Sequence, residues 1–427
     1  MPSTTEVTLE LAKPEKSNVL EPKPNRGCPA TIVLAFAAMV VGISSLAVGL
    51  VALSRAQAIE ARLQPLEVDA DTVKVTANAT PPVGYSGTST SLLAGSGSWA
   101  PNAQMPSERS DLQTISCGGV IVVLGGLDLA NNVMSTVFTF DVVSETYNAS
   151  KAPMPTPRYR FGAACVGNTQ IYVAGGFADT TTGNTGQSLG TVDIYDMARD
   201  SWSAGPPLNE PRGDLALVAA ADGSVHAIGG YDWSYNAMAT NERLPPGGTA
   251  WANGAPMPHP KGDVQAARIG DVIYVPGGWN ADRTFLNDLL AYDLVAGTWS
   301  SKAPMSFPRG DMAVAALNGK LYVIGGEMWS GRTSTCDWGW GPIECAVNLI
   351  PMHSVEMYSP DDDTWTEMAP LPSSRFRFAA AAANGRGGTS EGAIIAFGGH
   401  AHGEVAVRES WGFHDVPRPN LYLHTRA

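Results

Sequence analysis

The 427-residue chain has few cysteines and few charged side chains. Its five cysteines are too few for a scaffold held together mainly by disulfides. Charged residues make up only 16% of the chain, and 40 acidic residues against 27 basic ones give a net charge of −13. Because nucleic-acid binding needs a basic surface, we expect no nucleic-acid partner. The sequence also shows neither a Ser-His-Asp order nor a phosphate-binding loop, so no residue is assigned a catalytic role.

One long apolar stretch lies near the N-terminus. No charged residue occurs between Arg26 and Arg55, and residues 29–53 (PATIVLAFAAMVVGISSLAVGLVAL) are apolar almost throughout. At 1.5 Å per residue, a helix over this stretch is about 37 Å long, which is enough to cross a bilayer core. We therefore predict a transmembrane signal-anchor helix at 29–53. The alternative is a signal peptide cleaved after Ala58, although its apolar core would be longer than usual.

Three features predict that the chain beyond this helix lies outside the cytosol. More basic residues precede the helix than follow it closely, which favours a cytosolic tail at 1–28. Both Asn-x-Ser/Thr sequons, at Asn78 and Asn148, follow the helix and are predicted to be glycosylated. Cys336 and Cys345 also follow it and are predicted to form a disulfide. The chain is thus predicted to be a single-pass type II membrane protein of the secretory pathway or cell surface.

Small residues form a stripe along the predicted helix, at Ala38, Gly42, Ser45 and Gly49. Such a stripe lets two membrane helices pack closely, so a homodimer through this helix is one interpretation. The other interpretation is that small residues are simply common in membrane helices. Residues 54–97 follow, and they end in a stretch rich in Thr, Ser, Gly, Ala and Pro with little to bury. We interpret them as a stalk or linker.

Beyond the stalk the sequence repeats itself. An apolar run that ends in Gly-Gly occurs six times, at Val120–Gly126, Ile171–Gly176, Val225–Gly230, Ile273–Gly278, Leu321–Gly326 and Ile394–Gly399. The first glycines of successive pairs are 50, 54, 48, 48 and 73 residues apart. Three repeats carry a Phe-Asp or Tyr-Asp pair, and a fourth has Tyr358-Ser359 instead. A Trp ahead of a Pro-Met or Pro-Leu turn recurs at Trp202, Trp251, Trp299 and Trp365. Four short strands in each unit of about 50 residues are typical of a propeller blade.

These repeats resemble the kelch family. The resemblance rests on the six Gly-Gly pairs, the aromatic-Asp positions and the spaced tryptophans, and it covers most of the chain. It implies an all-β fold, a six-bladed kelch propeller at 98–416, with a short tail at 417–427. The sixth unit lacks its own Trp–Pro-Met segment, but Trp99–Pro106 aligns with Trp299–Ser306. We therefore expect the first strand of the domain to complete the last blade, which leaves the ring without a free edge.

One face of this propeller is predicted to bind a ligand. In a four-stranded antiparallel blade, the loop after the second strand and the loop between blades lie on the same face. Aromatic residues and one histidine fall in these loops, at Phe177, Tyr231, Trp233, Trp279, Trp329, Trp338, Trp340 and His400. Trp338 and Trp340 lie between Cys336 and Cys345, in the largest insertion. An aromatic and arginine-rich mouth is typical of binding surfaces.

A second prediction concerns the charge of this face. One basic residue precedes each inner strand, and the residue two positions later is Asp in four blades but Arg in the second and sixth. Strand alternation would place both residues on the same side. Ring closure would then gather five arginines into one positive crescent, namely Arg109, Arg158, Arg160, Arg375 and Arg377. We expect this crescent to bind an acidic peptide or an acidic sugar, the alternative being ion pairing between blades.

The repeat region also contains Cys117 and Cys165. They occupy equivalent strand positions in neighbouring blades, and we interpret them as buried free thiols because an isolated buried cysteine packs like a small apolar residue.

The kelch resemblance does not exclude catalysis, because some kelch proteins are enzymes. Copper radical oxidases of the family use an adjacent Tyr-His pair that this sequence lacks, and the iron-binding pattern Glu-x3-Asp-x3-His fails at Val218 after Glu210 and Asp214. No metal or cofactor is therefore predicted. We interpret the chain as a membrane-anchored, extracytosolic binding or scaffold protein whose ligand is a protein, an acidic peptide or a glycan. The alternative is a lumenal or secreted carbohydrate-active enzyme, of oxidase or sugar-epimerase type.

Overall fold

A computed structural model describes residues 97–178, 188–330, 349–383, 392–401 and 406–414, together with the backbone of 333–337 and 342–346. These residues fall in one compact unit, Thr90–Ala427. The predicted tail, membrane helix and stalk lie outside the described residues, as do Asn78, Trp338, Trp340 and the side chains of Cys336 and Cys345. Within the described part, none of the helices has the length and apolar character needed to cross a membrane.

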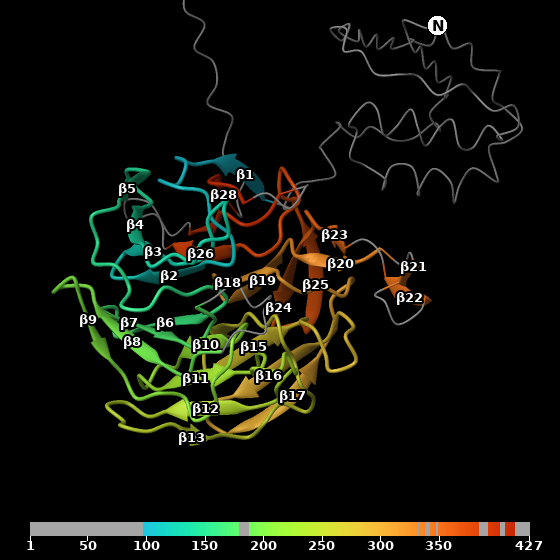
Figure 1. The fold of residues 1–427 in the computed structure, drawn as a ribbon, viewed down its shortest axis with the longest axis horizontal. Helices are drawn as coiled ribbons and strands as arrows, with labels where there is room; N and C mark the ends of the chain where they lie inside the picture. Colours follow the sequence, from blue (N-terminus) through green and yellow to red (C-terminus); the bar gives the residue numbers. More distant parts are fainter. Residues whose placement is uncertain are drawn as a thin grey trace, which may run out of the picture. The chain divides into compact units, whose positions relative to one another are not determined.

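Six four-stranded antiparallel sheets are arranged in a ring, and each sheet is one propeller blade (Figure 1). From the innermost strand outward, the first blade consists of β2 (Gln113–Cys117), β3 (Val120–Leu124), β4 (Val137–Asp141) and β5 (Thr146–Asn148). The second blade consists of β6 (Gly162–Val166), β7 (Gln170–Ala174), β8 (Val192–Asp196) and β9 (Ser201–Ala204). The third blade consists of β10 (Ala216–Ala219), β11 (Val225–Ile228), β12 (Asn241–Leu244) and β13 (Ala252–Asn253).

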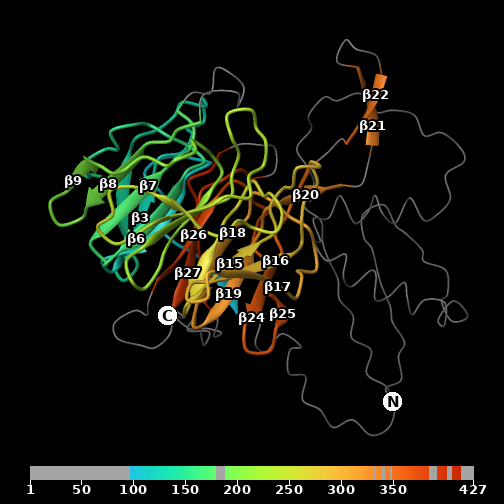
Figure 2. The same ribbon diagram turned by 90° about the horizontal axis from the view of Figure 1, so that it is seen from below.

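The fourth blade consists of β14 (Ala267–Ile269), β15 (Val272–Pro276), β16 (Leu289–Asp293) and β17 (Thr298–Lys302). The fifth blade consists of β18 (Ala313–Leu317), β19 (Lys320–Ile324), β24 (Val355–Ser359) and β25 (Thr364–Met368). The sixth blade consists of β26 (Ala379–Ala383), β27 (Ala393–Phe397), β28 (Ser410–His414) and β1 (Ser98–Pro101). Two short strand pairs extend the loop between β19 and β24, namely β20 (Glu327–Trp329) with β23 (Leu349–Pro351) and β21 (Thr333–Asp337) with β22 (Pro342–Ala346). Figure 2 shows the blades turned by 90°, with β15, β16 and β17 next to one another.

Hydrophobic cores fill the spaces between neighbouring blades. Between the first and second blades, for example, Val122 and Leu124 of β3 pack with Phe161 and Val173, and all four side chains are fully buried. The second strand of a blade can be a continuous apolar run, as in β3 (VIVVL) and β27 (AIIAF), because both of its faces are covered by other blades. The outermost strands contain fewer apolar residues, and β9, for example, is mostly exposed.

Each Gly-Gly pair lets a strand end tightly against the next blade. Gly125 and Gly126 both have positive φ values, 53° and 95°. A Cβ atom on Gly126 would lie 2.4 Å from the carbonyl oxygen of Ser110, so only glycine fits there. The amide of Gly126 donates a hydrogen bond to the carbonyl oxygen of Arg158 in the following blade, at 3.0 Å. The second glycine of every other pair makes the equivalent bond to the following blade.

The first strand completes the last blade, as the sequence predicted. β1 pairs antiparallel with β28, with Trp99 opposite Phe413. Trp99 also donates its indole N–H to the carbonyl oxygen of Ala369 at 2.8 Å. Met105 is 2% exposed and packs into the core between the last and first blades. The ring is therefore closed by chain segments that are more than 300 residues apart, as the hydrogen bond from Ser410 to Ala103 (307 residues apart) illustrates.

An aromatic residue of each outer strand ties its blade to the preceding one. Trp202, Trp299 and Trp365 donate their indole N–H groups to the carbonyl oxygens of Ala152, Ala255 and Ala303, at 2.9, 2.8 and 2.7 Å. In the first blade Tyr147 replaces tryptophan, and its hydroxyl donates to the carbonyl oxygen of Ala103 at 3.1 Å. The departure of this blade from the repeat pattern therefore keeps the interblade hydrogen bond.

The interpretation of Cys117 and Cys165 as free thiols is wrong. Cys117 of β2 and Cys165 of β6 form a disulfide, with a Cα–Cα distance of 5.6 Å. The reason is geometric: Cys165 lies one residue before Val166, the position equivalent to Cys117, so strand alternation turns it to the other side of its strand and toward Cys117 in the core between the two blades. The bond joins residues 48 positions apart, and on the chain-entropy account such a loop stabilises the fold by about 4 kcal/mol.

Candidate binding face and axial channel

The six basic residues that precede the inner strands are buried inside the blades. They are no more than 1% exposed and comprise Arg109, Arg158, Arg212, Lys261, Arg309 and Arg375. Arg309 shows the arrangement: Nη1 donates to the carbonyl oxygen of Gly325 at 3.0 Å, and Nη2 donates to Oε1 of Glu356 at 2.5 Å. Four further members of the set pair with an acid in the same way, as Arg158–Asp193, Arg212–Glu242, Lys261–Asp288 and Arg375–Glu409.

The first blade differs, because Phe138 occupies the position that Asp193 holds in the second blade. The guanidinium carbon of Arg109 lies 4.5 Å from the centre of the Phe138 ring, and Nη2 donates to the hydroxyl of Thr136 at 3.0 Å. An aromatic face attracts a cation and partly replaces the missing carboxylate. Burial without a carboxylate partner lowers the pKa of Arg109 to about 10.

The predicted positive crescent does not form. Arg109, Arg158 and Arg375 are buried inside their blades and are not available to a ligand. Strand alternation fails because the residue two positions later has a positive φ, as at Arg160 (52°) and Arg377 (54°). The left-handed turn directs the first basic side chain into the blade and the second residue into the central channel.

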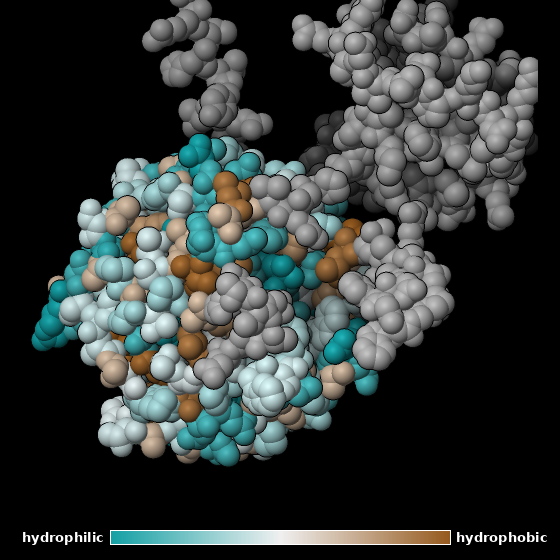
Figure 3. Space-filling model, viewed as in Figure 1, coloured by the Kyte–Doolittle hydropathy of each residue, from teal (hydrophilic) through white to brown (hydrophobic). Residues whose placement is uncertain are grey.

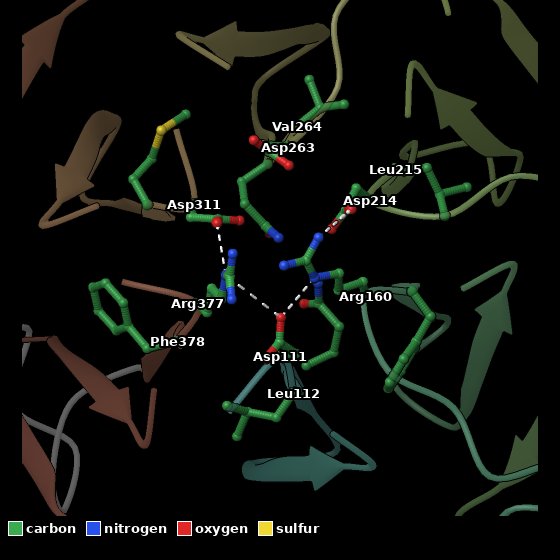
Figure 4. Close-up of a pocket in the computed structure, with 14 residues that line it drawn as sticks. Asp111, Leu112, Arg160, Asp214, Leu215, Asp263, Val264, Asp311, Arg377 and Phe378 are labelled. Carbon is green, nitrogen blue, oxygen red and sulfur yellow. Dashed lines mark hydrogen bonds and ion pairs between the residues drawn. The ribbon is translucent and has the colours of Figure 1, made fainter. Parts of the chain in front are cut away.

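Six residues, one from each blade, surround the mouth of this channel. They are Asp111, Arg160, Asp214, Asp263, Asp311 and Arg377 (Figure 4). Their backbones are hydrogen-bonded to one another around the ring. In four cases the amide of a ring residue donates to the carbonyl oxygen of the preceding ring residue. The bonds Arg160 to Asp111, Asp214 to Arg160, Asp111 to Arg377 and Arg377 to Asp311 measure 3.0, 2.7, 2.8 and 2.9 Å. The backbone thus links five of the six ring residues in a row, and Asp263 is the one that these bonds do not include.

Two arginines and three aspartates of this ring are paired. Arg160 lies between Asp111 and Asp214, with Nε–Oδ1 and Nη1–Oδ2 distances of 2.7 and 3.1 Å. Arg377 lies 3.0 Å from Asp311 and 4.0 Å from Asp111. Burial opposes ionisation of Asp111, but the two arginines hold its pKa below the usual value. Both positive charges predicted to attract an acidic ligand are therefore already matched by carboxylates.

Asp263 lies across the channel from Asp111 (Figure 4) and forms no ion pair with any described residue. Burial, together with the nearby Asp311 and Asp214, raises the pKa of Asp263 well above its usual value. Burial also raises the pKa of Asp214 to about 7, although Arg160 opposes this. One side of the ring is therefore short of positive charge.

Glu327, the residue after the fifth Gly-Gly pair, adds a further buried carboxyl beside this side of the ring. It is 3% exposed and forms a hydrogen bond with Asp311. Burial, with Asp311 close by, raises the pKa of Glu327 to about 8. The sequence predicted no role for Glu327, and the ring aspartates entered the prediction only as the residues two positions after a basic one.

The cavity at the channel mouth is small. It offers about 30 Å³ to the centres of water-sized atoms, which is room for roughly two waters. Apart from the six ring residues, its lining includes Gln113, Gln265, Leu112 and Phe378. The cavity therefore has space for water or an ion. It is too small for a sugar ring or for a large side chain of a bound peptide.

Aromatic side chains surround the channel on the predicted ligand face. Trp279, Phe285 and Trp329 form one cluster, in which Trp279 lies 4.6 Å from Phe285 and 5.4 Å from Trp329 between ring centres. Tyr231 and Tyr235 form another, stacked at 4.1 Å, and Tyr235 also contacts Phe177 at 6.5 Å. Phe177 and Tyr231 are buried, whereas Trp279, Trp329 and His400 are half-buried. The structure thus brings most of the predicted aromatic residues together, with Tyr235 and Phe285 as additions.

The exposed large hydrophobic side chains gather on the same face. Of the six in the described residues, four lie in loops after a second strand or between blades: Leu129, Trp233, Phe307 and Ile350. Trp233, between β11 and β12, is the most exposed of these four at 70%. The other two, Val143 and Val295, lie in the turns between third and fourth strands, on the opposite face. Figure 3 shows one face of the ring, on which hydrophobic residues form separate groups among hydrophilic ones.

Comparison with known proteins agrees with this fold. The family model described as the Kelch motif matches residues 157–209, 260–306 and 308–338. The domain is a six-bladed β-propeller whose second, fourth and fifth blades match the Kelch motif. Kelch-like protein 25 of Xenopus tropicalis is 29% identical to it over 181 residues, which cover 42% of this chain and 30% of that protein. Kelch-like protein 33 of Homo sapiens is 30% identical over 143 residues, which cover 33% of this chain and 26% of that protein.

A plant protein and a solved structure extend the kelch comparison. The F-box/kelch-repeat protein At1g15670 of Arabidopsis thaliana is 30% identical over 118 residues, covering 27% of this chain and 31% of that protein. The matched part of this chain therefore spans less than a third of the length of each of these relatives. A solved structure titled "Structure of YjhT" superposes with a TM-score of 0.59 at 14% identity, covering 72% of this chain and 95% of that one. At this identity the likeness concerns the fold alone.

Proposed function

We propose that this kelch propeller binds a partner protein and serves as a scaffold or adaptor. The observation that carries the proposal is the uneven distribution of exposed hydrophobic side chains, four of six of which lie on the face around the channel mouth. Large exposed apolar residues beside half-buried tryptophans are typical of protein-binding surfaces. We call this surface the channel face, and its members are Leu129, Trp233, Trp279, Phe307, Trp329 and Ile350.

The geometry favours a protein over an acidic sugar as the ligand of the channel face. Arg160 and Arg377 are matched by Asp111, Asp214 and Asp311, so the ring carries no spare positive charge. The channel cavity is also too small for a sugar ring. A protein surface that presents apolar anchors fits the exposed Trp233 without requiring a positive mouth.

We extend the proposal to location: the propeller lies outside the cytosol on a single-pass membrane anchor. Three features support this. Residues 29–53 are long and apolar enough for an anchor. The Cys117–Cys165 disulfide fits an oxidising compartment, because cytosolic thiols are kept reduced. Asn148 is exposed in the outermost strand β5, where a glycosylating enzyme can reach it.

This topology makes a prediction about the protein isolated from its host cells. Cys117 and Cys165 should resist alkylation until a reductant is added, and glycosidase treatment should lower the apparent mass. Replacing Asn148 by Gln should remove part of that mass shift, because the sequon is lost. Thiol labelling and gel mobility measure both effects. Freely alkylated thiols together with an unglycosylated chain would contradict the extracytosolic location.

The binding proposal is tested by a photo-crosslinking amino acid placed on either face of the propeller in living cells. At Trp233 on the channel face, we expect irradiation to link the chain to a second polypeptide. At Val295, which is 83% exposed on the opposite face, we expect no such product. Both positions are highly exposed, so accessibility alone does not separate them. Products of equal yield at both positions, or at Val295 alone, would contradict the assignment of the channel face.

A further inference from the structure

A cluster of oxygen atoms at the channel mouth has the composition of a cation site. One carboxylate oxygen from each of Asp214, Asp263 and Asp311 lies within 4.8 Å of the other two. Two oxygens bound to one calcium ion at about 2.4 Å can be as far apart as about 4.8 Å, so the spacing fits a shared ion. The side chains come from three consecutive blades (Figure 4), and the backbone links the first two of these blades, because the amide of Val264 donates to the carbonyl oxygen of Asp214 at 3.1 Å.

The charge balance of the ring leaves this side negative. Four aspartates and two arginines line the mouth. Arg160 is directed at Asp111 and Asp214, and Arg377 at Asp311 and Asp111. Asp263 has no basic partner among the described residues, although it stands next to two other carboxylates. Buried like charges are unfavourable unless a counterion or a proton neutralises them.

Glu327 provides a second, independent indication of a ligand. It is not one of the three clustered aspartates, and its side chain is 97% buried, being 3% exposed. Its carboxyl contacts Asp311, yet its Oε2 atom is buried and finds no hydrogen-bond partner among the described residues. A buried carboxyl oxygen without a partner, next to the carboxylate of Asp311, calls for a positive ligand, because an unsatisfied buried acceptor is costly.

We propose that the channel mouth binds one calcium ion, held by Asp214, Asp263 and Asp311 and supported by Glu327. All the candidate ligands are oxygen atoms, which is the preference of hard cations. The cavity has room for an ion and about one water. Calcium accepts irregular sets of six to eight oxygens, whereas magnesium demands a near-octahedral set, and three carboxylates on a fixed ring suit calcium better. The site lies beneath the channel face, so the ion would brace the loops of the third, fourth and fifth blades.

The test measures calcium binding by the full chain after removal of metal with EDTA. Titration calorimetry with calcium chloride should give one site per chain. The variant Asp263→Asn should weaken calcium binding by at least about tenfold, because it removes the one clustered carboxylate that pairs with no arginine. The variant Asp282→Asn changes an exposed aspartate of the same blade and should bind calcium like the unmodified chain.

Folding of the variant is checked separately. Without metal, Asp263→Asn should unfold at the same temperature as the unmodified chain or a higher one, because a buried like charge is removed. With saturating calcium, the unmodified chain should gain more in unfolding temperature than the variant does. The proposal is overturned if the unmodified chain binds no calcium at millimolar concentration, if Asp263→Asn binds it unchanged, or if magnesium binds more tightly. Calcium binding by the unmodified chain tests whether the site exists, even if the Asp263→Asn variant fails to fold.

Discussion

Deleting Ser98–Pro106 from the full chain is expected to abolish cooperative unfolding. The deletion removes β1, and β28 would become an unpaired edge with Trp411 and Phe413 newly uncovered. It also removes Met105 from the core between the last and first blades. Because every blade packs on two neighbours, opening the ring at one point exposes two blade surfaces. Thermal unfolding followed by circular dichroism measures the effect.

A deletion of the same length at 80–88 is the matched control, because those residues precede the propeller strands. It should unfold at the temperature of the unmodified chain. If the chain without Ser98–Pro106 also unfolded cooperatively at an unchanged temperature, the strand exchange that closes the ring would not be what holds the last blade.

Replacing Arg309 by Met should lower the free energy of unfolding by about 3–5 kcal/mol. Arg309 is fully buried, and its removal would leave Glu356 as an unpaired buried charge and the carbonyl oxygen of Gly325 without its donor. Breaking one half of a buried ion pair costs more than the pair itself is worth, because the remaining charge stays desolvated. Urea denaturation of the full chain measures the change.

Two further variants separate this mechanism from a general effect of losing an arginine. Arg199→Met removes an arginine whose side chain is 80% exposed and should change the free energy of unfolding by less than about 0.5 kcal/mol. Adding Glu356→Leu to Arg309→Met should recover part of the lost stability, because the stranded carboxylate is removed as well. A double variant less stable than Arg309→Met alone would show that the cost lies in packing and not in the unpaired charge.

The architecture could be predicted from the sequence because its signals are local and repeated. The Gly-Gly pairs recur because each one needs backbone angles and a close approach that only glycine tolerates, as Gly126 shows. The strand that closes the ring could be predicted because Trp99–Pro106 carries the segment that the sixth unit lacks. Even the substitution by Tyr147 follows the same rule, since its hydroxyl makes the bond that an indole makes elsewhere.

The site was harder to predict because it depends on one backbone angle per blade. The alternation rule treats Arg158 and Arg160 as neighbours on one side, but the positive φ of Arg160 sends them apart. The sequence marks that angle only weakly: aspartate, which tolerates a positive φ better than most residues, occupies four of the positions, but arginine occupies two and glycine would be the usual signal. The Cys117–Cys165 disulfide was missed for a related reason. The prediction treats the two cysteines as equivalent, but Cys165 is one residue out of step with Cys117, and that offset turns the two side chains toward each other across the interface.

The central claim, that the channel face binds a partner protein, is tested most directly by affinity. The partner is the polypeptide that crosslinks at Trp233, and its dissociation constant is measured for two double variants. Trp233→Ala with Trp329→Ala should weaken binding about 30-fold or more, the loss expected when two central aromatic anchors are truncated. Val143→Ala with Val295→Ala, which changes two exposed side chains of the opposite face, should leave the constant unchanged. An unchanged constant for the tryptophan variant, or a loss confined to the valine variant, would contradict the account.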